Sequence, residues 1–133
     1  MDSVAEIADY IRATRGDADA DLWAAIAANM RPELVDYLTV PLLAQMGGTA
    51  ELGRVTQLFV WLCRGDDAVV EVRFVYAPDN ELEVVLDGVE GFRALQTGKF
   101  YHEDIGEEVS ADESMLHLFF RGTPHLKSLL EDS

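Results

Sequence analysis

The consecutive polar residues His102, Glu103 and Asp104 form one group in this chain that could bind a cation or transfer protons. Imidazole and carboxylate side chains do both kinds of chemistry in proteins. Adjacent polar residues are also common in solvated loops, and that is the environment we expect here. The other histidines, His117 and His125, do not form the His-x-x-x-His spacing of a helical metal site. We therefore assign no catalytic residue, no metal ligand and no cofactor-binding residue.

Three aspartates at alternate positions, Asp17, Asp19 and Asp21, match the opening of a calcium-binding EF-hand loop. Such a loop also needs glycine at its sixth position and glutamate at its twelfth. Leu22 and Ala28 occupy those two positions, so an EF-hand is excluded. The acids instead suit the N-terminal end of a helix, where the backbone dipole favours negative charge.

The sequence motifs give nucleophilic catalysis no support. The chain has no Gly-x-Ser-x-Gly turn, no phosphate-binding P-loop and no Gly-x-Gly-x-x-Gly turn. Its one cysteine, Cys63, ends the apolar run 58–63, and we expect a buried, unreactive thiol there. A single cysteine cannot form a disulfide within the chain. These absences favour a protein that is not an enzyme.

The chain carries a large excess of negative charge, with 25 Asp and Glu against 10 Lys and Arg and a net charge of −15. A field of this sign repels nucleic acid phosphates and anionic lipids, and it attracts basic protein surfaces. The alternative is acidity that only maintains solubility or reflects adaptation of a whole proteome. The N-terminus lacks the pattern of a signal peptide, and no apolar run approaches the length of about 20 residues that spans a bilayer. We therefore expect a cytoplasmic protein with no membrane partner.

The sequence favours a binding module whose acidic surface engages a basic protein partner. Immunity proteins, antitoxins, secretion chaperones and anti-defence inhibitors are small acidic domains of this kind. Aromatic side chains dominate the energetics of such interfaces, and an aromatic pair lies beside acids in a stretch that we expect to be an exposed loop. The predicted partner-binding residues are Phe100, Tyr101, Glu103, Asp104, Glu107 and Glu108.

Two other functions stay open. A small enzyme or small-molecule-binding domain would need a pocket between helices and sheet, and the groups that could line it are Arg73, Tyr76, His102 and His117. A nucleic-acid mimic would need carboxylates in rows at the spacing of phosphates. Dimerisation of the chain through a sheet edge or through its first helix is also open.

Helical spacing dominates the first third of the chain. An apolar stripe predicts a first helix that Ser3 caps and Gly16 ends. Asp21 suits the N-cap of a second helix. Pro32 suits the first residue of a third helix, which Pro41 should kink or split before a Gly-Gly pair ends it.

Strand patterns dominate the middle of the chain. Residues 55–63 are apolar on both faces and predict a central strand, although their spacing also fits a helix. Alternating apolar residues predict strands at 70–76 and 82–87, and turn-forming residues predict turns at 64–67 and 78–80.

The signals weaken from residue 88 to residue 110, where we expect loops and one helical turn near residues 92–95. Residues 114–121 fit a strand or, with Ser110 and Glu113 as a capping box, a helix. Their alternating apolar residues favour the strand.

Proline after threonine at position 123 opens a short terminal helix. Together the elements predict one α+β domain spanning residues 1–133. It consists of N-terminal helices, an antiparallel β-meander of three to four strands and a short C-terminal helix.

Overall fold

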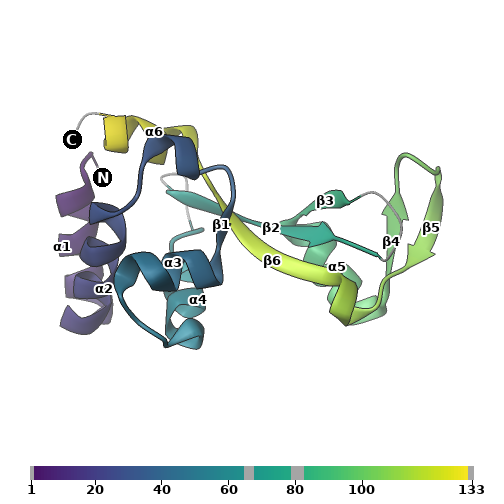
Figure 1. Ribbon diagram of the computed structural model, residues 1–133, viewed down its shortest axis with the longest axis horizontal. Coiled ribbons are helices and arrows are strands. Elements are labelled where there is room, and N and C mark those ends of the chain that lie inside the picture. Colours follow the sequence, from purple (N-terminus) through teal and green to yellow (C-terminus); the bar gives the residue numbers. More distant parts are fainter. Residues whose placement is uncertain (1, 65–67, 79–82, 132–133) are drawn as a thin grey trace. The chain divides into compact units, whose positions relative to one another are not determined.

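A computed structural model describes residues 2–64, 68–78 and 83–131 (Figure 1). The chain forms two compact units, which we call unit 1 (Met1–Glu71 and Phe120–Ser133) and unit 2 (Val72–Phe119). The expectation of one domain over the whole chain stays a prediction. The predicted turns at 64–67 and 78–80 and the first residue of the predicted strand at 82–87 lie partly outside the described residues.

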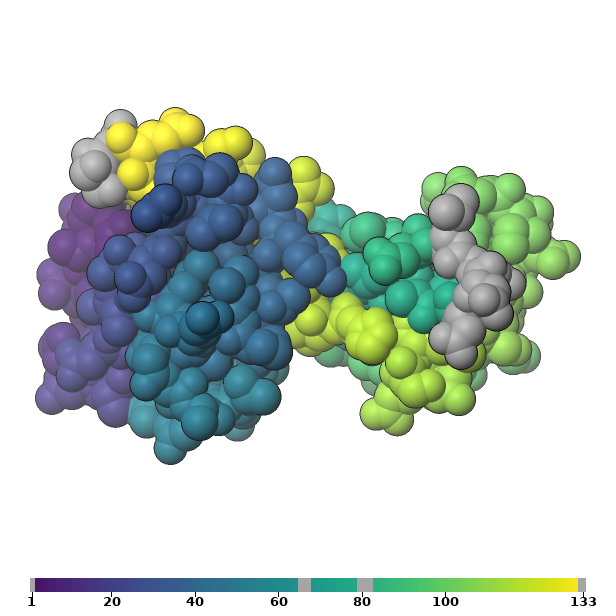
Figure 2. All heavy atoms as spheres, viewed as in Figure 1, coloured from purple at the N-terminus to yellow at the C-terminus, as the bar shows by residue number. Residues whose placement is uncertain are grey.

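Helices α1 (Val4–Arg15) and α2 (Asp17–Ala28) lie side by side in unit 1 (Figures 1 and 2). The predicted cap of α1 is confirmed, because the Glu6 amide donates to Ser3 Oγ at 3.0 Å. Gly16 ends α1 with a φ of 104°. The predicted N-cap at Asp21 is wrong, since the N-cap of α2 is Gly16, five residues earlier, and three aspartates lie within the first turn and a half of the helix.

The helix predicted from Pro32 is split, as one interpretation of Pro41 predicted, and it ends at Gly47, but its first part is not an α-helix. The chain instead forms a 3-10 turn (η1, Pro32–Leu34), a short strand (β1, Leu38–Thr39) and a new helix (α3, Val40–Gly47). Thr39 caps α3 by accepting a hydrogen bond from the Leu42 amide at 3.2 Å. Pro41 therefore lies in a first helical turn, where its missing N–H costs nothing.

The predicted central strand at residues 55–63 is also wrong, because these residues belong to helix α4 (Leu52–Trp61). Val55, Leu58 and Phe59 are buried, whereas Val60 is exposed. Burial at spacings of three and four residues marks one covered helical face. A run that is apolar on both faces is compatible with a helix when only one face is covered.

Aromatic side chains form much of the core of unit 1. Trp23, Phe59 and Phe120 are fully buried, and the ring of Phe59 lies 6.2 Å from that of Trp23 and 5.6 Å from that of Phe120. The Trp23 indole N–H donates to the Val4 carbonyl at 3.1 Å, which satisfies its one polar group. Helix α6 (Pro124–Glu131) adds three buried leucines to unit 1.

Four strands form one sheet in the order β1-β6-β2-β3. Strands β2 (Val70–Tyr76) and β3 (Val84–Asp87) are antiparallel neighbours, as predicted, with Phe74 opposite Leu86. The strand prediction for residues 114–121 is confirmed by β6 (Leu116–Gly122). Glu113–Met115 forms only a 3-10 turn, η2, before this strand.

Residues 88–110 are more ordered than the predicted loops. Helix α5 (Gly88–Thr97) is followed by a hairpin of β4 (Lys99–His102) and β5 (Glu107–Ser110), and α5 packs against β3 and β4. The loop prediction fails because Asp87 caps α5, accepting from the Glu90 amide at 2.8 Å.

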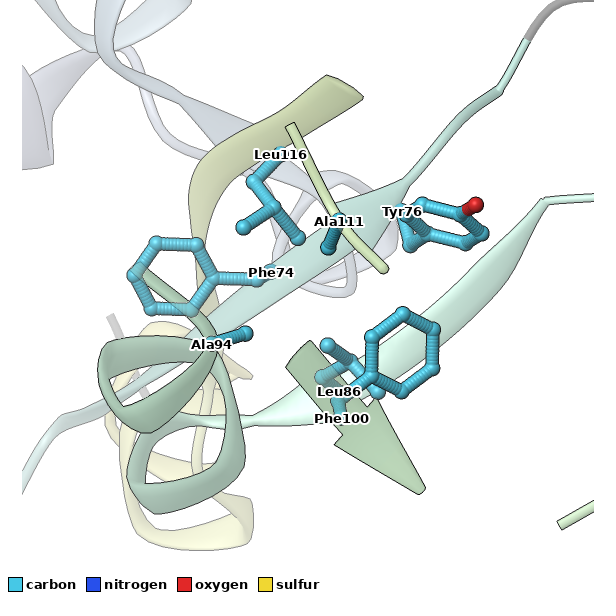
Figure 3. Close-up of a cluster of buried hydrophobic side chains, with 7 residues drawn as sticks. All are labelled: Phe74, Tyr76, Leu86, Ala94, Phe100, Ala111 and Leu116. Carbon is cyan, nitrogen blue, oxygen red and sulfur yellow. The ribbon is translucent and has the colours of Figure 1, made fainter. Parts of the chain in front are cut away.

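The core of unit 2 lies between these elements (Figure 3). Its buried members are Phe74, Tyr76, Leu86, Ala94, Phe100, Ala111 and Leu116. Tyr76 and Phe100 meet edge to face with ring centroids 4.8 Å apart. The described elements therefore confirm the α+β class, with N-terminal helices, antiparallel strands and a short C-terminal helix.

Candidate functional site

A groove of about 380 Å³ lies on unit 2 between strands β3 and β4. All four residues of β3 line one side of it, and Tyr101–Asp104 lines the other. Arg73 and Glu90 complete the lining. The groove therefore lies mainly between two strands, with Glu90 of helix α5 in its lining, whereas the pocket of a small-molecule domain was predicted between helices and sheet.

Strand β3 presents an edge of the sheet to this groove. It is the last strand in the order β1-β6-β2-β3, and no other described strand pairs with it besides β2. The β4–β5 hairpin forms a separate two-stranded sheet across the groove. Because alternate residues of an edge strand point their N–H and C=O groups outward, β3 can accept a further strand.

His102 is a buried member of the groove lining. It is the last residue of β4 and is 7% exposed, so the prediction that it lies in a solvated loop is wrong. Successive residues of a strand face opposite sides, and His102 shares the buried side with Phe100, whose ring stacks on the imidazole at 5.9 Å. His102 Nδ1 is buried with no hydrogen-bond partner among the described residues. A buried polar atom of this kind is uncommon in folded proteins, where an ordered water or a bound group often satisfies it.

Negative charge surrounds the groove. The acidic side chains in its lining come from Asp87, Glu90, Glu103 and Asp104, against one guanidinium from Arg73. The Asp87 carboxylate already accepts the capping hydrogen bond of α5. Glu103 and Asp104, in the turn after β4, are exposed. The lining therefore attracts cationic groups.

The predicted partner-binding residues divide into one buried and five exposed side chains. Phe100 is 7% exposed, so the expectation that it lies in an exposed loop is wrong: β4 turns it into the core of unit 2. Tyr101, the next residue, is 61% exposed. The acids Glu103, Asp104, Glu107 and Glu108 are exposed around the same hairpin. Figure 2 shows the green atoms of this hairpin at the surface of unit 2.

The sequence prediction missed several residues of this surface. Ile105, at the hairpin turn, is 54% exposed beside the acids. Asp87 and Glu90 were missed although Asp-x-x-Glu is a capping-box pattern that follows an alternating strand. From the groups predicted for a pocket, Arg73 and His102 line the groove, whereas Tyr76 is in the core and His117 is exposed outside the lining.

Asp19 in unit 1 is buried and has a structural role. Its carboxylate accepts hydrogen bonds from Arg15 Nε at 2.8 Å and from Arg54 Nε at 3.1 Å. Burial raises the pKa of Asp19, and the hydrogen bonds from the two arginines lower it by more, so the pKa lies below its ordinary value. A carboxylate held ionised by two guanidinium groups joins α1, α2 and α4 and is unsuited to proton transfer.

Other sites of chemistry find little support in the described residues. No group of three or more His, Cys, Asp or Glu side chains within them could hold a metal ion. Cys63 is half-buried, and its thiol donates to the Phe59 carbonyl at 3.2 Å. Across residues 2–64, 68–78 and 83–131, no helix has both the length and the apolar character that crossing a membrane requires. No family model, no curated protein and no solved structure matches the chain.

Proposed function

We propose that this protein is a non-enzymatic binding module that engages a basic protein partner through the acidic surface of the β4–β5 hairpin. One observation supports the proposal most directly: the hairpin exposes Tyr101 and Ile105 beside four acidic side chains. Exposed aromatic and aliphatic groups provide the apolar contact of an interface, and the surrounding acids provide charge complementarity.

The charge of the hairpin is poorly balanced within the chain. Lys99 Nζ lies 3.9 Å from Glu108 Oε1, at the outer limit of an ion pair, and both side chains are more than half exposed. Glu103, Asp104 and Glu107 have no ion pair with any described residue. A basic partner would provide the counter-charges, since exposed pairs of this kind contribute little to the fold itself.

Two stages of binding follow from this surface. The net charge of −15 accelerates the encounter with a cationic partner over distances set by ionic strength. Burial of the Tyr101 ring, now 61% exposed, then slows dissociation. Charge therefore acts mainly on the association rate, and Tyr101 acts mainly on the dissociation rate.

The proposal is tested by affinity capture from the source organism and by the kinetics of the captured partner. The hairpin variant carries Glu103→Gln, Asp104→Asn, Glu107→Gln and Glu108→Gln. The matched control neutralises exposed acids of unit 1 and carries Asp9→Asn, Glu33→Gln, Asp36→Asn and Glu131→Gln. Both variants lose the same charge, so only the position of the charge differs.

We expect the association rate of the wild type to fall at least tenfold between about 50 and 500 mM salt. The hairpin variant should associate more slowly than the control at low salt, and Tyr101→Ala should dissociate faster. Equal rates for the two charge variants would show that the acidity acts only through bulk charge, and a salt-independent rate would reject electrostatic steering.

Binding of a small cationic molecule is a second candidate function. The volume of the groove, about 380 Å³, falls within the range of small-ligand pockets, and buried His102 lies within it. Calorimetric titration with argininamide tests this candidate. A dissociation constant tighter than about 100 μM would support it, and the absence of heat would remove it.

A further inference from the structure

The groove has the arrangement of a slot for one additional β-strand. Strand β3 is the edge of the four-stranded sheet, and the groove follows all four of its residues, Val84–Asp87. Strand β4 of the separate hairpin forms the opposite wall. Neighbouring strands of a sheet lie about 4.8 Å apart, so a segment that pairs with β3 lies within the groove.

We propose that an extended, basic segment of the partner binds in this groove as an added strand of the sheet, paired with β3. This inference rests on the proposed function, because it specifies how the basic partner is held. Backbone hydrogen bonds to β3 give the segment its affinity, and its side chains point alternately to the two faces of the sheet. Every second residue of the segment is cationic and meets the carboxylates of the groove.

The groove specifies the chemistry of its occupant through two features. Glu90, Glu103 and Asp104 all contribute carboxylates to the lining, so lysine or arginine side chains suit the groove. His102 Nδ1 is buried in the lining without a hydrogen-bond partner among the described residues. This nitrogen is inaccessible in the free protein, so a polar group of the bound segment satisfies it only after the imidazole turns toward the groove, which removes the cost of leaving it unpaired.

Charge argues against a second copy of this chain as the occupant. Each copy carries a net charge of −15, and edge-to-edge pairing would bring the same acidic linings together. Like charges that meet at an interface oppose association. The edge of β3 therefore suits a strand of opposite charge.

The experiment uses the full-length protein and a displayed library of random ten-residue peptides. The tightest selected peptides are resynthesised in two forms, one plain and one N-methylated at alternate backbone nitrogens. N-methylation removes the N–H groups that pair with a strand edge and preserves side chains and charge. Both phases of methylation are made, because only one of them lies on the bonding edge.

We expect the selected sequences to carry Lys or Arg at every second position. One phase of N-methylation should weaken binding by at least about tenfold, as the loss of two or more backbone hydrogen bonds predicts, and the other phase much less. Hydrogen exchange at the amides of residues 84–87 should slow when the plain peptide is bound. His102→Phe should weaken binding about fivefold, whereas the control His117→Phe, outside the groove lining, should not.

The outcomes separate the two proposals. Peptides that bind in a salt-dependent manner but tolerate both methylation phases would overturn strand addition and leave the basic-partner function standing. Selection of no basic peptide, together with salt-independent partner capture, would overturn both. A stable dimer of the free protein with protected β3 amides would place a second copy on this edge and overturn the inference.

Discussion

Substitution of Gly91 by alanine tests the packing that holds helix α5 on the sheet of unit 2. Gly91 is buried in the middle of α5, directly above the ring of Phe74 on β2. A Cβ added at this position would lie 2.5 Å from Cγ and 2.6 Å from Cε1 of Phe74. The ring atom Cδ1 would lie closer still, and carbon atoms in contact prefer a separation of about 3.5–4.0 Å, so the ring or the helix must move by more than about 1 Å.

The size of the effect follows from two opposing contributions. Phe74 is 2% exposed, and its ring also packs edge to face on Phe92 at 5.1 Å, so it has little room to yield. Overpacking of this kind costs up to about 3 kcal/mol. Alanine stabilises a helix interior by about 1 kcal/mol over glycine. We therefore expect Gly91→Ala to lower the free energy of unfolding by about 2 kcal/mol.

Gly53→Ala is the matched control. Gly53 lies in helix α4, and a Cβ added there would have no atom within 4 Å among the described residues. The free energy of unfolding of this variant should rise by up to about 1 kcal/mol, because alanine favours the helix over glycine and meets no neighbouring atom. Urea unfolding followed by far-UV circular dichroism measures both variants. If Gly91→Ala were as stable as Gly53→Ala, the close approach of α5 to β2 would be refuted.

Three further predictions concern the ion pair, the hairpin and the two units. Asp19→Asn should lower stability by about 2 kcal/mol at pH 7, because two arginines lose their charged acceptor. Folding lowers the pKa of Asp19, so the contribution of its carboxylate to the free energy of unfolding is complete above about pH 4 and declines as the pH falls further. The difference in free energy of unfolding between Asp19→Asn and the wild type, measured by urea titration, should therefore narrow towards pH 3. Phe100→Ala should lower the free energy of unfolding by about 3 kcal/mol because Phe100 is buried. Tyr101→Ala should change it by less than about 0.5 kcal/mol and act on binding, because Tyr101 is exposed. Calorimetric unfolding of both variants measures this difference. If residues 1–133 unfold as one domain, fluorescence of Trp23 and Trp61, both in unit 1, should follow the same unfolding curve as circular dichroism of the whole chain, and two separate midpoints would contradict a single cooperative domain.

Short-range signals predicted the elements at the two ends of the chain correctly. The cap of α1 at Ser3, its end at Gly16 and the buried leucines of α6 depend on residues within one or two helical turns. Strand β2 was also clear from alternation alone. These features are local because a cap or a period of two or 3.6 residues involves only sequence neighbours.

The errors occurred where a pattern admitted two structures. Residues 55–63 fit both a strand and a helix, and contact of a single face with Trp23 and Phe120 through Phe59 favours the helix. Proline at position 41 ends a helix or begins one, and the pairing of β1 with β6 makes residues 38–39 a strand, so the helix that contains Pro41 begins after Thr39. Contacts between residues far apart in the chain thus override local preference.

The sequence by itself determined the charge of this protein, its α+β class and the absence of recognisable catalytic motifs, since these follow from composition and local pattern. It also placed the acids and Tyr101 in one segment. Only the tertiary structure decided that Phe100 and His102 turn inward while Tyr101 stays exposed. The groove exists because β4 pairs with β5 in a separate sheet and not with β3, which leaves β3 as an edge facing β4. The identity of an edge strand depends on the pairing of segments distant in sequence, and no local pattern contains that information.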